Sequence, residues 1–300
     1  MDLSGSLCAL ATPFRPDDDA VDFDAFGRLV DAQVDAGTRA LVVAGSTGEA
    51  AALDDAEFER LVAFAVERAA RRVPVIAGTG LSSTRKTIAQ TRRAAAAGAD
   101  AALVVVPAYV RPTQEGMLRH FSEVAVQGGL PVMLYNVPGR TASDLLPATV
   151  ARLAAHGNII GIKEAVADPG RMQDLLALRS DAFRVYSGDD PTAARAMLAG
   201  ADGVVSVAAN VAPAPFVALC AACRAGDRAT AAALDARLQP LYAALSLEPN
   251  PIPVKWLLAR LGFGSATPRL PLTPLDGTHH AAAAAALAAL GPVEATAAVG

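Results

Sequence analysis

Short runs of apolar, often β-branched residues recur along the chain, and stretches with a helical pattern separate them. The apolar runs fall at residues 6–11, 40–43, 73–77, 101–106, 132–135, 159–163, 183–187 and 203–207. The stretches between them predict helices at residues 22–36, 54–71, 84–97, 114–127, 147–155, 170–180 and 192–199. Because the short runs are apolar on both faces, they are typical of strands in a parallel sheet that is covered on both sides.

The number of predicted strands favours a closed barrel. Eight strands alternating with helices suit an α/β fold of the (β/α)8 TIM-barrel type, and an open doubly wound sheet is the alternative. No Gly-x-Gly-x-x-Gly follows the first strand, which argues against a dinucleotide-binding fold. Beyond about residue 212 the pattern predicts only helices, at 213–225, 227–247, 251–261 and 281–290. We therefore expect a catalytic barrel at 1–224 and a C-terminal helical domain at 225–300, with 291–300 frayed.

Composition and charge exclude several classes of protein. With 53% apolar and 19% charged residues in 300, the chain can bury a large core and is not a disordered protein. A net charge of -4 without a block of Lys or Arg argues against a nucleic-acid partner. The N-terminus lacks a signal-peptide pattern, and no charge-free apolar run approaches ~18 residues, so we expect a cytoplasmic protein.

Lysine is rare in this chain, which narrows the candidates for an amine nucleophile. Of 26 basic residues only three are lysines, namely Lys86, Lys163 and Lys255. An arginine stays charged, whereas a buried lysine can lose its proton and attack a ketone to form a Schiff base.

The strand at 159–163 places one lysine where a barrel carries its active site. Alternation predicts that Ile160 and Ile162 face the outer helices, while Gly161 and Lys163 face the lumen. Desolvation there would lower the pKa of Lys163 and free its neutral amine. A lysine that is solvated or paired with Glu164 at the strand end is the alternative.

The preceding strand places a tyrosine beside this lysine. The same alternation puts Met133 and Tyr135 in the lumen. A phenol at that position can relay a proton to a carbinolamine or to a substrate carbon. A core tyrosine with a satisfied hydroxyl is the alternative.

Two segments could bind carboxylates. Gly45-Ser46-Thr47-Gly48-Glu49 follows a predicted strand, and its turn offers backbone N–H groups and two hydroxyls, unless it is only an ordinary turn before a helix. Arg140 lies in the loop 136–141 just past Tyr135 and could grip a carboxylate with its guanidinium, unless it is a surface arginine.

Cysteines and histidines carry no recognisable chemistry here. Cys220 and Cys223 have a redox spacing, but they lie in a predicted alanine-rich helix, so we expect two buried thiols. None of the four histidines shows a metal-ligand spacing, so we expect no metal site.

Together these motifs resemble the pyruvate-dependent class I aldolase family, which includes N-acetylneuraminate lyases and the synthases of dihydrodipicolinate. Gly45-Ser-Thr-Gly-Glu49, Tyr135-Asn-Val-Pro138 and Gly161-Ile-Lys-Glu164 resemble signatures of the whole family. Arg140-Thr141, Ser187-Gly-Asp-Asp190 and the stretch 248–255 resemble the branch that makes dihydrodipicolinate. The resemblance runs from about residue 5 to about residue 275.

The resemblance implies a role for each pyruvate-facing residue. Lys163 would form the Schiff base with pyruvate, and Tyr135 would be the acid and base. Ser46 and Tyr109 would complete a proton relay, with Tyr109 reaching into a neighbouring subunit. Thr47 would bind the pyruvate carboxylate.

The second substrate implied is L-aspartate 4-semialdehyde, in the first committed step of lysine and diaminopimelate biosynthesis. Arg140 would hold its carboxylate, while Gly188 and Val205 would line the site through backbone groups. No metal or organic cofactor is implied, and the family is typically a homotetramer built as a dimer of dimers.

The pocket that binds the inhibitor lysine in regulated members differs here. The matching positions are Ala50, Ala51, Asp55, Phe58, Ser82, Lys86 and Ala108. Lys86 replaces an acid there and would repel the cationic amine of lysine, so we expect feedback inhibition to be weak or absent.

Two other functions remain open from the sequence. One is another pyruvate-dependent aldolase, acting like an N-acetylneuraminate lyase or on a keto-deoxy sugar acid, although sugar-acid lyases resemble a pattern without Arg140. The other is a catalytically silent keto-acid-binding paralogue, although it would be expected to lose Lys163 or Tyr135.

Overall fold

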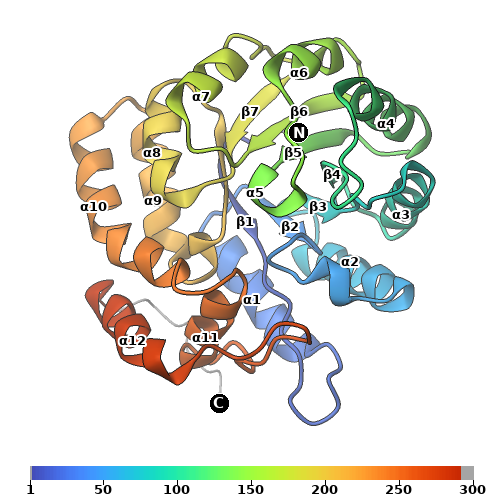
Figure 1. The fold of residues 1–300 in the computed structure, drawn as a ribbon. Helices are drawn as coiled ribbons and strands as arrows, with labels where there is room; N and C mark the ends of the chain where they lie inside the picture. Colours follow the sequence, from blue (N-terminus) through green and yellow to red (C-terminus); the bar gives the residue numbers. More distant parts are fainter. Residues whose placement is uncertain (1, 292–300) are drawn as a thin grey trace.

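The computed structural model describes residues 2–291, and within them eight parallel strands close into a barrel in sequential order, β1 to β8 (Figure 1). The strands are β1 (Gly5–Ala9), β2 (Ala40–Val43), β3 (Val75–Gly78), β4 (Ala101–Val105), β5 (Val132–Asn136), β6 (Ile159–Glu164), β7 (Arg184–Ser187) and β8 (Gly203–Ser206). The TIM-barrel prediction is therefore confirmed, and the open sheet is wrong because β1 pairs with β8.

Helices surround this barrel and cover the outer face of the strands (Figure 1). They are α1 (Phe23–Asp35), α2 (Asp55–Ala69), α3 (Thr84–Ala96), α4 (Gln114–Gln127), α6 (Pro147–Ala154), α7 (Pro169–Leu176), α8 (Asp190–Leu198) and α9 (Pro213–Arg224). The short helix α5 (Pro138–Thr141) lies inside this ring, directly after β5 (Figure 1). Local sequence explains many of the starts. Asp54 caps α2 with a reciprocal bond to Glu57, and Thr113 caps α4 through its hydroxyl.

The C-terminal helices α10 (Arg228–Leu245), α11 (Ile252–Arg260) and α12 (His280–Ala289) follow the barrel. Helix α10 packs against α8 and α9, and α12 packs against α10 and α11. The division of the chain at residues 224 and 225 stays a prediction, and the prediction for the last ten residues concerns mainly 292–300, which lie outside the described part. No helix between residues 2 and 291 combines the length and apolar character needed to span a bilayer.

The buried apolar residues form two clusters, one inside the barrel and one between the strands and the surrounding helices. The inner cluster includes Met133, Tyr135, Tyr186 and Val205. The outer cluster between strands and helices includes Ile162. Alternation along the strands therefore predicted the facing of Met133, Tyr135 and Ile162 correctly.

Two details of the sequence-based prediction are wrong. Ile160 packs against the inner cluster, because the pairing of β5 with β6 shifts by one residue at Val132 and leaves Ile160 without a partner. Residues 138–141 form the short helix α5 within the predicted loop, with Pro138 at its first turn.

Candidate active site

The predicted catalytic pair meets at the carboxyl end of β6. Lys163 is only 5% exposed, and its Nζ lies 4.3 Å from the centroid of the Tyr135 ring. Tyr135 is the neighbour of Lys163 on β5, and Tyr186 is its neighbour on β7. Among residues 2–291 the Lys163 amine forms no ion pair and no side-chain hydrogen bond, so it is buried with its nitrogen free.

Glu164 does not pair with Lys163, so that alternative is wrong. Its carboxylate points to the outer side of β6, where Asn136 donates to both oxygens at 3.1 Å and the Val166 N–H donates at 2.8 Å. Burial raises the pKa of Glu164 to about 7, against the lowering effect of these hydrogen bonds.

Gly188 explains how the lysine side chain fits. A Cβ at this position would lie 2.8 Å from Cε and 2.9 Å from Cγ of Lys163, closer than such carbons can approach. The Gly188 N–H donates to the Glu164 carbonyl at 2.7 Å, which places this backbone directly beside the lysine stem. Val205 on β8 is fully buried in the inner cluster with Tyr135.

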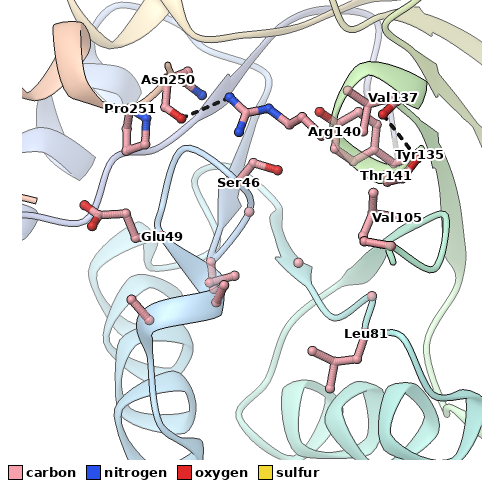
Figure 2. Close-up of a pocket in the computed structure, with 18 of the residues that line it drawn as sticks. Ser46, Glu49, Leu81, Val105, Tyr135, Val137, Arg140, Thr141, Asn250 and Pro251 are labelled. Carbon is pink, nitrogen blue, oxygen red and sulfur yellow. Dashed lines mark hydrogen bonds between the residues drawn. The ribbon is translucent and has the colours of Figure 1, made fainter. Parts of the chain in front are cut away.

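A cavity of about 520 Å³ opens beyond Tyr135, at the carboxyl ends of β2 to β5 (Figure 2). Ser46, Tyr135 and Arg140 line it, together with Ala108 and Asn250. Among the described residues the Tyr135 hydroxyl has no hydrogen-bond partner. A phenol that is free at the cavity wall is available to exchange a proton with a bound molecule.

The turn at residues 45–49 leads into a single 3-10 turn at Ala50–Ala52, and not directly into an α-helix. Helix α2 begins only at Asp55, and Glu49 adopts a left-handed conformation with φ 54°. The N–H groups of Glu49 and Ala50 donate to the carbonyls of Ser46 and Gly45 within the turn. Thr47 is buried, and its Oγ1 accepts a hydrogen bond from Asn250 Nδ2 at 3.0 Å.

Arg140 lies on α5 and reaches over the cavity mouth, where its Nη2 donates to the Asn250 carbonyl at 3.0 Å (Figure 2). Arg140 is exposed but contributes to the cavity wall, so its grip on a carboxylate stays a prediction. Tyr109, in contrast, is 92% exposed with φ 72°, and it does not line the cavity of its own chain.

Two contacts at the site have no counterpart in the sequence-based prediction. Asn250 connects Thr47 with Arg140, and Lys255 forms a buried ion pair with Glu49 of the turn. Asn250 and Lys255 both belong to the stretch 248–255. This stretch stands out in the sequence only through its resemblance to the dihydrodipicolinate-forming branch.

The described residues contain no group of three or more His, Cys, Asp or Glu side chains placed to hold a metal ion. The three cysteines are free and buried, and burial raises the pKa of each thiol, as expected for packing residues. The polar side chains that line the cavity are hydroxyls, an amide and two guanidinium groups, together with the Glu49 carboxylate, which is paired with Lys255. The guanidinium and hydroxyl groups suit an organic carboxylate.

A buried amine over a phenol, at the carboxyl end of a closed (β/α)8 barrel and next to an open cavity, is the arrangement expected of a Schiff-base lyase. Comparison with known proteins agrees with this class. Residues 2–290 match the dihydrodipicolinate synthetase family, and the chain belongs to that family.

Individual relatives match over nearly the whole chain. A 4-hydroxy-tetrahydrodipicolinate synthase of Stenotrophomonas maltophilia (strain K279a) is 59% identical over 283 residues, which cover 94% of this chain and 95% of the relative. The chloride-inhibited dihydrodipicolinate synthase of Acinetobacter baumannii, solved with pyruvate, is 42% identical with a TM-score of 0.94. The match covers 96% of this chain and 99% of that protein. A structure described as the first monomeric dihydrodipicolinate synthase variant is 39% identical with a TM-score of 0.94. The match covers 96% of this chain and 97% of that variant.

Proposed function

We propose that this protein is a lyase that condenses pyruvate with L-aspartate 4-semialdehyde, the reaction of a 4-hydroxy-tetrahydrodipicolinate synthase. The observation that carries the proposal is the free amine of Lys163, buried against Tyr135 in a chain that matches such synthases over nearly its full length. An amine without an ion-pair partner can lose its proton and act as a nucleophile, which a paired lysine cannot do as readily.

The first half of the reaction builds the nucleophile. The neutral amine of Lys163 attacks C2 of pyruvate, and water leaves to give a protonated imine. The imine withdraws electrons, so a methyl proton departs and an enamine forms. Tyr135 accepts and returns protons, and Ser46 and the Tyr109 of a neighbouring subunit extend the relay. Thr47 holds the pyruvate carboxylate.

The second half joins the substrates. The enamine carbon attacks the aldehyde carbon of L-aspartate 4-semialdehyde, and the aldehyde oxygen takes up a proton to become a hydroxyl. Arg140 holds the carboxylate of this substrate at the cavity mouth, which orients the aldehyde toward the enamine. The substrate amine then attacks the imine carbon and closes the ring, and Lys163 leaves as a free amine. Gly188 and Val205 shape the wall through their backbone.

We also infer a cytoplasmic homotetramer, built as a dimer of dimers. A tyrosine that is 92% exposed in a left-handed conformation supports a contact with another subunit. Analytical ultracentrifugation measures the assembly, and a monomer with full activity would contradict the role of Tyr109 in the relay.

Reduction with borohydride in the presence of pyruvate tests the mechanism. We expect peptide mapping by mass spectrometry to find a pyruvyl adduct on Lys163 and on neither Lys86 nor Lys255. Loss of L-aspartate 4-semialdehyde with formation of the cyclised product then tests the second substrate. Turnover of a keto-deoxy sugar acid instead would identify another aldolase of the family, and absence of any adduct would identify a silent paralogue.

A further inference from the structure

Asn250 connects the two groups that we assign to the two substrate carboxylates. It lies between α10 and α11, at the cavity wall opposite α5 (Figure 2). Its side-chain Nδ2 donates to Thr47 Oγ1 at 3.0 Å, and its main-chain carbonyl accepts from Arg140 Nη2 at 3.0 Å. Its Oδ1 is buried and accepts no hydrogen bond from any described residue. Thr47 is thus the one side-chain partner that fixes the amide.

The direction of the bond to Thr47 determines what the hydroxyl can do. A threonine hydroxyl has one proton and two lone pairs. When an amide N–H occupies a lone pair, the hydroxyl proton must point elsewhere and can be donated to a carboxylate. An incoming donor also polarises the hydroxyl and strengthens the hydrogen bond that it donates.

We propose that Asn250 is a positioning residue for both substrates. Its amide keeps Thr47 as a donor toward the carboxylate of pyruvate, and its carbonyl holds Arg140 at the cavity mouth for the second substrate. This inference rests on the proposed function, and it adds a residue that acts through Thr47 and Arg140 rather than on the reacting atoms.

The surroundings of Asn250 keep this geometry rigid. Lys255, on the helix that follows, forms an ion pair with Glu49, two residues beyond Thr47. The backbone N–H of Arg269 donates to the other Glu49 oxygen at 2.9 Å. The turn is therefore fastened to the 250 region at two points and to Arg269 at a third, which is the support that a precise binding group needs.

The two contacts of Asn250 can be separated, because one uses the side chain and the other the backbone. In Asn250→Ala the carbonyl still accepts from Arg140, while Thr47 loses its donor. We expect the pyruvate concentration at half-maximal rate to rise about five- to tenfold, the typical effect of one lost hydrogen bond. The KM for L-aspartate 4-semialdehyde should stay within about twofold, and the melting temperature should not fall.

Asn250→Asp reverses the direction of the bond. The carboxylate accepts the Thr47 proton, so the hydroxyl can no longer donate to pyruvate, and the effect on pyruvate should exceed that of Asn250→Ala. The added charge also repels pyruvate, and the same substitution in a Thr47→Val background separates the two causes. If Asn250 acts through Thr47, the effect of Asn250→Asp shrinks markedly in that background.

Pyruvate-dependent borohydride labelling of Lys163, measured without the aldehyde, gives a readout independent of the second substrate. A wild type that is labelled but forms no cyclised product contradicts the proposed reaction, while the labelling curve of each variant still tests Asn250. Equal changes for both substrates together with a lower melting temperature would show a merely structural loop. That structural result would overturn the inference. So would an unchanged dependence of labelling on pyruvate in Asn250→Ala, or an effect of Asn250→Asp that is equally large in the Thr47→Val background.

Discussion

Lys163 and Lys255 are both buried and both lie over an aromatic ring, but only Lys255 has an anionic partner among residues 2–291. Lys163 Nζ lies 4.3 Å from the Tyr135 ring centroid, and Lys255 Nζ lies 4.1 Å from that of Phe14. Lys255 forms an ion pair with Glu49 in which each side chain is 2% exposed, whereas the described residues offer Lys163 no such partner.

The difference separates a nucleophile from a structural cation. Burial lowers the pKa of Lys255, and the charge of Glu49 opposes that effect. A buried ion pair joins two segments firmly but keeps the amine occupied. An amine without a carboxylate contributes little to the fold and stays available to a ketone. Replacing each lysine by methionine, which keeps the length of the side chain, turns this comparison into an experiment.

Lys163→Met should have the largest effect on activity. It removes the amine that forms the Schiff base, so we expect kcat/KM to fall on the order of 10⁴-fold or more. The melting temperature should not fall, because the Lys163 side chain forms no ion pair or hydrogen bond with the residues that the structure describes. Coupled product assays and thermal melts measure both. As the matched control, Lys86→Met at an exposed position should leave both values unchanged. Residual activity above about a tenth would identify a different nucleophile.

Tyr135→Phe should have the next largest effect. The ring below Lys163 remains, and only the hydroxyl that moves protons is lost, so we expect kcat to fall about 10²- to 10⁴-fold. Stability should change little, because the hydroxyl has no partner among the described residues. Single-turnover labelling with pyruvate should slow in parallel with kcat. If kcat fell less than about threefold, Tyr135 would be a packing residue of the inner cluster.

Lys255→Met should reduce stability rather than chemistry. It leaves the buried carboxylate of Glu49 without its cation, and we expect the free energy of unfolding to fall by about 3–5 kcal/mol. Chemical denaturation measures this loss.

Adding Glu49→Gln to Lys255→Met should recover part of the loss, because a neutral amide can still accept from the Arg269 N–H. If Lys255→Met alone is as stable as wild type, the ion pair makes no net contribution to the free energy of unfolding. Lys255 and Lys163 would then not differ in their contribution to stability.

The sequence predicted the barrel and the catalytic pair because both depend on local patterns. Strand alternation alone puts Tyr135 and Lys163 on the inner side of neighbouring strands, and the register confirms it. The facing of Ile160 was missed because a shift in strand pairing leaves no mark in the composition of a strand. Helix α5 was missed because a Pro-Gly start is typical of loops.

The contacts of the C-terminal segment could not be predicted. Thr47 and Asn250 are 203 positions apart, and Glu49 and Lys255 are 206 apart. A helical periodicity shows which face of α11 is apolar, but it does not show against which part of the barrel that face packs. The partner of a buried polar side chain in such a segment is therefore known only from the fold.

The two glutamates nearest to these lysines extend the comparison. Glu49 is paired with Lys255, whereas the only cation near Glu164 among the described residues is Arg171, at 3.9 Å. Burial raises the pKa of Glu164 from 4.5 to about 7. A raised pKa means that the folded state binds the proton more tightly than the unfolded state does. The resulting stabilisation is complete below about pH 4.5 and is lost as the pH rises through about 7.

Glu164→Gln should therefore flatten the pH dependence of stability between about pH 5 and 8. As the pH rises, the free energy of unfolding of the variant should increase relative to that of wild type, by at most about 3 kcal/mol at pH 8. Melting temperatures of the two proteins across this range, taken as a difference, measure the gain. A difference that is constant with pH would mean that Glu164 is ionised throughout the range.

Lys86, the third lysine, is exposed and should matter least to catalysis and folding. We expect free lysine at about 1 mM to leave the rate unchanged. Ala50, Ala51 and Ala108 line this part of the cavity without ligands for an amino acid, and Ser82 already donates its hydroxyl to the Ala108 carbonyl. Lys86 does not itself line the cavity, and the resemblance implies that its charge would repel the ammonium groups of lysine. Initial rates at subsaturating pyruvate provide the measurement, and half-inhibition below 1 mM would show that this region binds lysine through other groups.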